Sequence, residues 1–362
     1  SITVSLNVDP TPLHAGFATS VVSSFVGTQL FDTLIRKTGD GQFEPCLATE
    51  WSFSEDGRDI TFTLRDDVTF HNGDKMTAED VAFSYNTVLN AGFSGSVTSA
   101  MTGMDVVDET HVVLHFEEPY GPAIECVSQP CMGIFSKAAY EADPDGFPRN
   151  PVGTGAYQFV QWKADDSITL KAYESYFQGK PSIENLTFKI YKNATSAALA
   201  LENGELDLLT SPSSTDYTRL SNNESLQFGT TVSSTVTWLQ FSMKGDSIFK
   251  DENLRLAVAH AIDKESVILG AVEGQGELAK SVVPSYSFGV GDFEMPEYNP
   301  EKAKEFFETA KAELGKDTFT FDMVVDADDA PQKVAQVVKE QLETTLEGLT
   351  VNLTVEPKKQ RV

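Results

Sequence analysis

Alternation of apolar and polar residues predicts short strands along much of the chain. Residues 2–8 alternate and end at Asp9-Pro10, and residues 60–64 place Ile60, Phe62 and Leu64 on one face. Alternation or short apolar runs predict further strands at 68–70, 111–116, 156–161, 167–172, 186–191 and 204–209. The first two thirds of the chain therefore reads as strand-rich.

A turn followed by a capped helix is predicted after the strand at 68–70. Residues 71–74 (His-Asn-Gly-Asp) suit a tight turn, because Asn-Gly tolerates positive φ angles. Thr77 is a good N-cap and Asp80 can answer it from the first turn, with apolar residues at helical spacing behind them. A second helix is expected at 195–203, and the proline-rich stretches 119–130 and 144–151 are expected to be loops.

Helices and strands alternate after about residue 237. The apolar residues of 254–262 form a helical stripe, and Asn299-Pro300 suits the start of another helix that would stop at Gly315. Residues 319–355 predict a strand, a helix and a strand, which is the crossover unit of a parallel sheet. Parallel strands usually belong to larger sheets covered on both faces, so this last part is expected to be incomplete.

The composition is that of a globular and strongly acidic protein. The 362 residues include 27 Lys and Arg against 54 Asp and Glu, which gives a net charge of −27, and 40% of residues are apolar. Such a charge argues against binding to nucleic acid or to an anionic membrane surface. The length predicts two or three domains. Because the chain begins at Ser1 rather than at methionine, we expect that a leader was removed or that the chain was cut.

Motifs for catalysis or metal binding are not evident in the sequence. It has no phosphate-binding Gly-x4-Gly-Lys-Ser/Thr, no Gly-x-Ser-x-Gly and no His-Glu-x2-His. His111 and His115 lie on a predicted strand about 13 Å apart, too far to share a metal. Cys126 and Cys131 could pair, although they read more simply as two buried thiols. We therefore predict no catalytic residue, no metal site, no cofactor and no enzymatic activity.

Several ordered segments resemble one protein family. Residues 47–51 (Leu-Ala-Thr-Glu-Trp), 61–65, 68–73 and 77–81 resemble the signature of the peptide/nickel/oligopeptide family, family 5, of ABC-importer extracellular solute-binding proteins. Residues 150–157, 204–207, 249–264 and 298–304 resemble later family segments in the same order, with Ala156 where proline is common. The agreement runs from about residue 20 to 355.

The resemblance implies a mixed α/β fold of the two-lobed, periplasmic-binding-protein-like kind. Residues 1–30 and 150–236 would form the base domain of the first lobe, 31–149 an inserted α+β domain, and 237–362 a partial second lobe, truncated at the C-terminus. The signature residues Trp51, Phe62, Leu64 and Phe70 would build a core rather than contact ligand, and Gly73 would form a turn.

The resemblance also implies a function. The protein would capture short peptides in a cleft between the lobes and deliver them to ABC permease and ATPase subunits. It would be a monomer outside the cytoplasm, in the periplasm or lipid-anchored to the outer face of a bacterial membrane. The alternatives are a nickel chelate, haem or an oligosaccharide as ligand, or a surface peptide receptor without transport.

The position of each segment in the family predicts the ligand-contacting residues. Trp238 could equally be a core residue. The predicted set is Thr19, Ser20, Val21, Phe93, Ser96, Cys131, Met132, Thr210, Ser211, Trp238 and Gln240.

Overall fold

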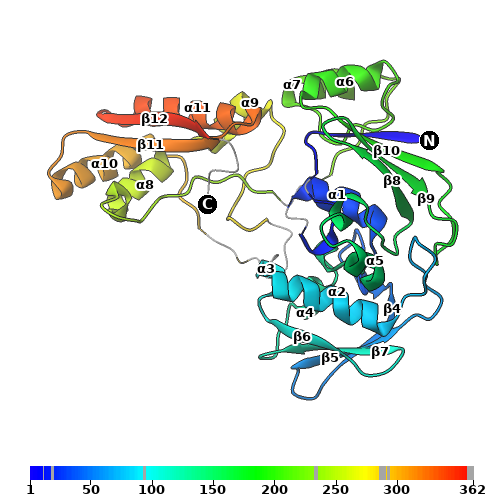
Figure 1. The fold of residues 1–362 in the computed structure, drawn as a ribbon. Helices are drawn as coiled ribbons and strands as arrows, with labels where there is room; N and C mark the ends of the chain where they lie inside the picture. The colour runs from blue at the N-terminus through cyan, green and yellow to red at the C-terminus, as the bar shows by residue number, and fades with distance from the viewer. Residues whose placement is uncertain are drawn as a thin grey trace. The chain divides into compact units, whose positions relative to one another are not determined.

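The protein forms two compact units in the computed structural model, Ser1–Pro212 and Ser213–Val362 (Figure 1). The structure describes residues 1–10, 12–17, 20–92, 95–231, 235–284, 291 and 294–356. The break between the units precedes helix α7 (Ser214–Ser221), whereas the sequence suggested a change near residue 237. The finer division into base, inserted and partial second-lobe domains stays a prediction.

The first sheet of unit 1 carries the N-terminal strand at its edge. Its order is β1-β10-β9-β8, with β1 parallel to β10 and the other neighbours antiparallel. Helix α1 (Val21–Leu30) packs against it, with the rings of Phe25 and Phe188 5.7 Å apart, and α6 (Ala194–Glu202) follows the last strand. The strands are β1 (Ile2–Leu6), β8 (Tyr157–Lys163), β9 (Ser167–Ala172) and β10 (Asn185–Ile190). The predicted strands are thus confirmed within a few residues.

The second sheet of unit 1 is antiparallel, in the order β4-β5-β7-β6, and α2 (Ala78–Ala91) lies over it (Figure 1). Phe62, Leu64 and Phe70 are buried and Trp51 is partly buried, which confirms their predicted core role. The strands are β4 (Ala48–Phe53), β5 (Asp59–Leu64), β6 (Met101–Val106) and β7 (His111–Phe116).

The start of α2 follows the sequence prediction closely. The Thr77 side chain accepts a hydrogen bond from the Asp80 N–H at 3.3 Å, and Asp80 accepts one from the Thr77 N–H at 3.0 Å. Gly73 has φ +91° in the preceding turn, as expected. The predicted strand 68–70 is wrong, because only a single bridge between Thr69 and Lys75 forms there.

Short elements complete unit 1 and correct the two predicted loops. The stretches 119–130 and 144–151 contain helical turns, because Pro122 lies at the N-cap of α4 and Pro148 at the start of η3, where a missing N–H costs nothing. These short elements are β2 (Ile35–Lys37), β3 (Phe43–Pro45), η1 (Ala15–Phe17), α3 (Gly95–Thr98), α4 (Ala123–Val127), η2 (Pro130–Met132), α5 (Lys137–Ala142) and η3 (Phe147–Arg149).

Unit 2 contains the predicted strand–helix–strand crossover. Strands β11 (Phe319–Asp326) and β12 (Leu349–Glu356) pair in parallel and are joined by α11 (Asp329–Thr345). Asn299 caps α10 (Pro300–Leu314) and Gly315 ends it with φ +62°, both as predicted. The other elements are η4 (Ile248–Lys250), α8 (Glu252–Ala261) and α9 (Lys264–Val272).

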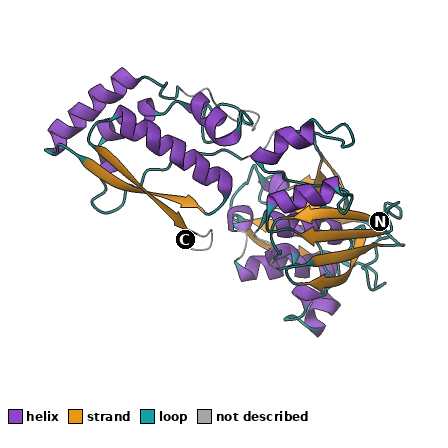
Figure 2. Ribbon diagram, turned by 90° about the horizontal axis from the view of Figure 1, so that it is seen from above, coloured by secondary structure: helices purple, strands orange, loops and turns teal. Residues whose placement is uncertain are grey.

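The β11–β12 pair is covered on one face. Phe319 and Met323 of β11 and Val351 of β12 are buried, whereas the alternate residues Thr320 and Thr350 are exposed. Figure 2 shows α10 and α11 on one side of the pair. Alternating burial of this kind differs from the continuous apolar runs of a parallel sheet covered on both faces.

Side chains from the covering helices bind the backbone of two edge strands. Asn86 of α2 donates to the Met104 carbonyl of β6 at 2.8 Å and accepts from the Met104 N–H at 2.9 Å. On β12, Glu343 accepts from the Val351 N–H at 2.8 Å and Lys339 donates to the Val351 carbonyl at 2.6 Å. These contacts fix both helices to their sheets. None of the helices in the described ranges is both long enough and apolar enough for a membrane span.

Candidate functional site

The carboxyl ends of parallel backbone segments meet at one edge of the first sheet. Strand β1 runs parallel to β10, and Val4 of β1 forms a parallel bridge with Leu208. Open sheets with parallel strands bind ligands outside these carboxyl ends. The buried strand predicted within residues 204–209 is wrong, because only this single bridge forms there and Leu208 is 49% exposed. The bridge nevertheless brings the residues that follow it to this edge of the sheet.

Thr210 and Ser211, two predicted ligand contacts, follow that bridge. The Thr210 N–H donates to Ser5 Oγ at 3.2 Å, and the Thr210 hydroxyl donates to the Ser5 carbonyl at 3.3 Å. Ser5 is buried, while Thr210 and Ser211 are exposed. The backbone is thus fixed by a buried partner at the point where two hydroxyl side chains reach the surface.

The predicted contacts near α1 and α3 are at the surface of unit 1. Ser20 is the N-cap of α1, where its Oγ accepts from the Ser23 N–H at 3.1 Å. Val21 is 86% exposed, and Ser96 of α3 is exposed as well. Thr19 and Phe93 lie outside the described residues. Val21 and Ser96 are thus accessible, while the Ser20 hydroxyl is engaged in capping.

Cys131 and Met132 are placed in the core of unit 1. Both belong to η2 and are buried, with exposed fractions of 8% and 1%. Cys46, Cys126 and Cys131 are free thiols in buried positions, so the reading of Cys126 and Cys131 as unpaired thiols is confirmed. The structure gives Cys131 and Met132 a packing role, and their contact with ligand stays an untested prediction.

Trp238 and Gln240 belong to an extended segment of unit 2. Leu239 and Phe241 pack against the core of that unit, and the Phe241 ring lies 4.7 Å from that of Phe249. The alternate residues Trp238 and Gln240 are exposed, and Trp238 is 58% exposed. Trp238 is therefore not a core residue in this structure. The segment presents an aromatic and an amide side chain from a backbone anchored to the core.

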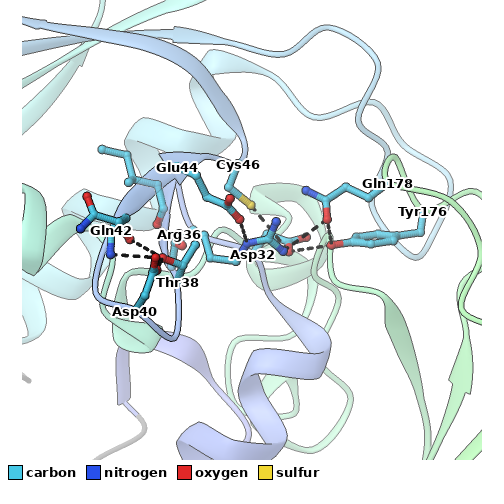
Figure 3. Close-up of polar contacts among 11 residues, drawn as sticks. Asp32, Arg36, Thr38, Asp40, Gln42, Glu44, Cys46, Tyr176 and Gln178 are labelled. Carbon is cyan, nitrogen blue, oxygen red and sulfur yellow. Dashed lines mark hydrogen bonds and ion pairs between the residues drawn. The ribbon is translucent and has the colours of Figure 1, made fainter.

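Asp32 is the centre of a polar cluster that the sequence did not reveal (Figure 3). The Tyr176 hydroxyl donates to its Oδ1 at 3.1 Å, and the Cys46 thiol lies 3.9 Å from the same oxygen. The Thr154 hydroxyl donates to Oδ2 at 3.1 Å and accepts from the Asp32 N–H at 3.2 Å. We call Asp32, Cys46, Thr154 and Tyr176 the Asp32 cluster. Its members come from four separate stretches of the sequence.

Burial has the largest effect on the pKa of Asp32. It raises this pKa from 3.8 to about 6, against the lowering effects of the Tyr176 and Thr154 hydroxyls and the Arg36 charge. Arg36 is itself engaged by Glu44 at 2.8 Å and by Gln178 at 3.3 Å. Burial also raises the pKa of Cys46 to about 12, so that its thiol stays protonated.

His71 holds the glycine-containing loop 152–155 from the side of the tight turn. Its Nδ1 accepts from the Gly153 N–H at 3.3 Å, so Nε2 carries the proton and donates to the Gly155 carbonyl at 2.9 Å. Burial lowers the pKa of His71 to about 4, which keeps the ring neutral. The partners of His71 were not evident from the sequence, because Gly153 and Gly155 lie more than eighty positions away from it.

Two further histidines, His111 and His115, contact carboxylates on the second sheet of unit 1. His111 Nδ1 lies 2.8 Å from Asp108, and His115 bridges Asp59 at 2.7 Å and Asp105 at 3.3 Å. These groups are partly exposed on strand β7 and its neighbours. In the part of the chain that the structure describes, no group of three or more His, Cys, Asp or Glu side chains is arranged to hold a metal ion.

Comparison with known proteins identifies the family. The sequence profile of the bacterial extracellular solute-binding proteins, family 5 (middle region), matches residues 42–362. The chain belongs to this family. The predicted resemblance is thereby confirmed.

The names of two similar proteins include a ligand. The dipeptide-binding protein of Escherichia coli (strain K12) is 28% identical over 313 residues, which are 79% of this chain and 58% of that protein. Heme-binding protein A of Haemophilus influenzae is 26% identical over 342 residues, 86% of this chain and 62% of that protein. The chain thus spans less than two thirds of either relative.

The fold is shared with a solved family structure. The oligopeptide-binding protein AppA of Bacillus subtilis, in complex with a nonapeptide, superposes with a TM-score of 0.84 at 24% identity, covering 99% of this chain and 75% of AppA. This confirms the predicted mixed α/β fold of the periplasmic-binding-protein-like kind.

Proposed function

We propose that this chain is part of an extracytoplasmic solute-binding protein that captures short peptides and delivers them to an ABC importer. The observation that carries the proposal is the family match over residues 42–362, supported by a dipeptide-binding relative. The protein would bind its ligand without transforming it and would work as a monomer with permease and ATPase subunits. It would reside in the periplasm or be lipid-anchored at the outer face of the membrane.

The exposed residues of the two units suit recognition of a peptide main chain. In unit 1, Ser211 exposes a hydroxyl beside Thr210, whose own hydroxyl donates to Ser5; unit 2 exposes the Gln240 amide and the Trp238 ring. Main-chain groups supply the affinity in such recognition, while side-chain pockets tolerate variation. Four neutral hydrogen bonds at about 1 kcal/mol each and two charge-assisted ones at about 1.5–3 kcal/mol each give roughly 7–10 kcal/mol. A micromolar Kd corresponds to about −8.2 kcal/mol.

We expect the 362-residue chain alone to bind peptides weakly. If it supplies half of these contacts, the remaining free energy corresponds to a Kd in roughly the millimolar range. Isothermal calorimetry with a panel of di- to pentapeptides measures this directly. A Kd below about 10 μM would show that the assignment of a partial second lobe is wrong.

The class of ligand is best tested on the full-length protein. Native mass spectrometry of co-purified ligand should detect peptides, whereas haem, a nickel chelate or an oligosaccharide would replace the peptide proposal by one of its alternatives. Trp238→Ala should weaken peptide binding roughly 2- to 10-fold, because an aromatic contact contributes about 0.5–1.5 kcal/mol. Phe53→Ala is the matched control, since Phe53 is similarly exposed, at 51%, and lies outside the predicted set.

A further inference from the structure

Two stretches of unit 1 cross at very short range beside Asp32. The chain leaves α1 through Leu30 and Asp32, and the loop 152–155 lies against it before β8 begins. The Gly155 N–H donates to the Leu30 carbonyl at 2.9 Å. A Cβ added at Gly153 would lie 2.1 Å from the Leu30 oxygen, which leaves no room for any other residue type. The crossing connects the first sheet to everything between β2 and η3.

Asp32 is the side chain that joins both sides of this crossing. Its carboxylate and N–H bind Thr154 of the loop, and its carbonyl accepts from the Ile134 N–H at 2.9 Å. Tyr176, in the connection after β9, binds the other carboxylate oxygen. Moving Asp32 therefore disturbs contacts with three further parts of the fold at once.

The groups facing Asp32 leave its charge state finely balanced. The hydroxyls of Thr154 and Tyr176 and the Cys46 thiol all donate to the carboxylate, which favours its ionised form. Burial opposes ionisation. The nearest cation, Arg36 of β2, makes its hydrogen bonds to Glu44 of β3 and to Gln178 rather than to Asp32. Asp32 is partly buried, and within the described ranges its carboxylate accepts hydrogen bonds from uncharged groups only.

We propose that the Asp32 cluster is a pH-dependent contact whose own contribution to holding residues 29–32 against the loop 152–155 is larger in mild acid than at neutral pH, opposite in sign to the contribution of His71 on the same loop. A charged Asp32 favours any opening of the crossing that lets water reach it, whereas a neutral carboxyl can stay buried at lower cost. The proposal concerns the fold itself and goes beyond the identity of the ligand.

The direction of the pH effect follows from proton linkage. The pKa of Asp32 is about 6 in the folded protein against 3.8 as the reference, so the folded state binds the proton more tightly. The stabilisation is fully present below pH 3.8 and is lost as the pH rises through 6. Between pH 7.5 and 4.5 the folding equilibrium constant should gain roughly 10- to 30-fold from this one group.

The test compares the chain with its Asp32→Asn variant at pH 4.5 and 7.5. An asparagine mimics the neutral carboxyl, so the change in the folding equilibrium constant from pH 7.5 to 4.5, measured by urea unfolding, should be roughly 10- to 30-fold less favourable in the variant than in the unmodified chain. His14 and His71 titrate in the same range, but they are common to both proteins and cancel in the difference. Asp66→Asn, which removes an exposed carboxylate in the same unit, should keep the full pH dependence.

Hydrogen exchange gives a local readout of the crossing. For peptides that cover residues 150–158, corrected for intrinsic exchange rates, the ratio of protection at pH 4.5 to protection at pH 7.5 should be higher in the unmodified chain than in Asp32→Asn. His71, which binds the same loop, affects both proteins alike. An equal ratio in the two proteins, or a lower ratio in the unmodified chain than in Asp32→Asn, overturns the proposal. If Asp32→Asn does not fold, Tyr176→Phe decides, because losing this donor should move the transition to higher pH. An unchanged transition pH in Tyr176→Phe also overturns it.

Discussion

Gly153→Ala probes the close contact between α1 and the loop 152–155. The added methyl group would lie 2.1 Å from the Leu30 oxygen and 2.5 Å from the Phe31 ring, so the loop has to move away from α1. Gly153 does not have a positive φ, so the substitution tests the contact rather than the backbone angle. A displaced loop weakens the hydrogen bonds of Gly153 with His71 and of Gly155 with Leu30.

The expected loss of stability follows from these contacts. Overpacking a closed site costs about 1–3 kcal/mol, and each hydrogen bond that is weakened costs about 1 kcal/mol. We therefore expect Gly153→Ala to lower the free energy of unfolding of unit 1 by roughly 2–4 kcal/mol. Gly27→Ala in α1 is the matched control, because a Cβ there meets nothing within 4 Å. The control should gain about 0.5–1 kcal/mol, as alanine favours helix more than glycine does.

Urea unfolding followed by tryptophan fluorescence measures both variants. Trp51 and Trp162 lie in unit 1 and Trp238 in unit 2, so a Trp238→Phe background makes the emission report unit 1. This separation is needed because two units need not unfold in a single transition. A Gly153→Ala protein within about 0.5 kcal/mol of its parent would refute the argument. So would a Gly27→Ala protein that loses as much stability as Gly153→Ala does.

Three further predictions concern caps, histidines and thiols. Thr77→Ala should cost about 1 kcal/mol in urea unfolding, because it removes half of the capping box of α2; an unchanged midpoint would show that the cap is redundant. Burial lowers the pKa of His71 to about 4, so its stabilisation is present above pH 6.5 and is lost as the pH falls toward 4. His71→Gln should remove up to about 2 kcal/mol of the difference in stability between pH 7.5 and 5, and an identical pH profile would contradict this. The three buried cysteines should resist a thiol reagent in the native protein and react fully in urea; rapid labelling without urea would count against their burial.

Local patterns were the part of the fold that sequence predicted best. The capping box of Thr77 and Asp80, the start of α10 at Asn299 and the alternation of β5 depend on residues within a few positions of one another. Two of the errors arose where proline was read as a loop signal. Helix α4 begins directly after Pro122 and buries Ala123, Cys126 and Val127, a helical spacing that the sequence did contain.

The Asp32 cluster and the partners of His71 could not be predicted in this way. Asp32 meets Thr154 and Tyr176 across more than a hundred positions, and neither hydroxyl is marked by a local pattern. The exposure of a side chain also depends on residues that are distant in the sequence. Trp238 and Met132 are both apolar, yet Trp238 is at the surface and Met132 is in a core. Among the predicted ligand contacts, sequence position alone therefore could not separate accessible side chains from buried ones.

The side chains bound to the edge strands have a consequence for association between molecules. An incoming strand seeking the outer edge of β12 would find the N–H and carbonyl of Val351 already occupied by Glu343 and Lys339. Asn86 occupies Met104 of β6 in the same way. Exposed strand edges are templates for aggregation. At these two positions the bound side chains therefore disfavour pairing with a strand of another molecule.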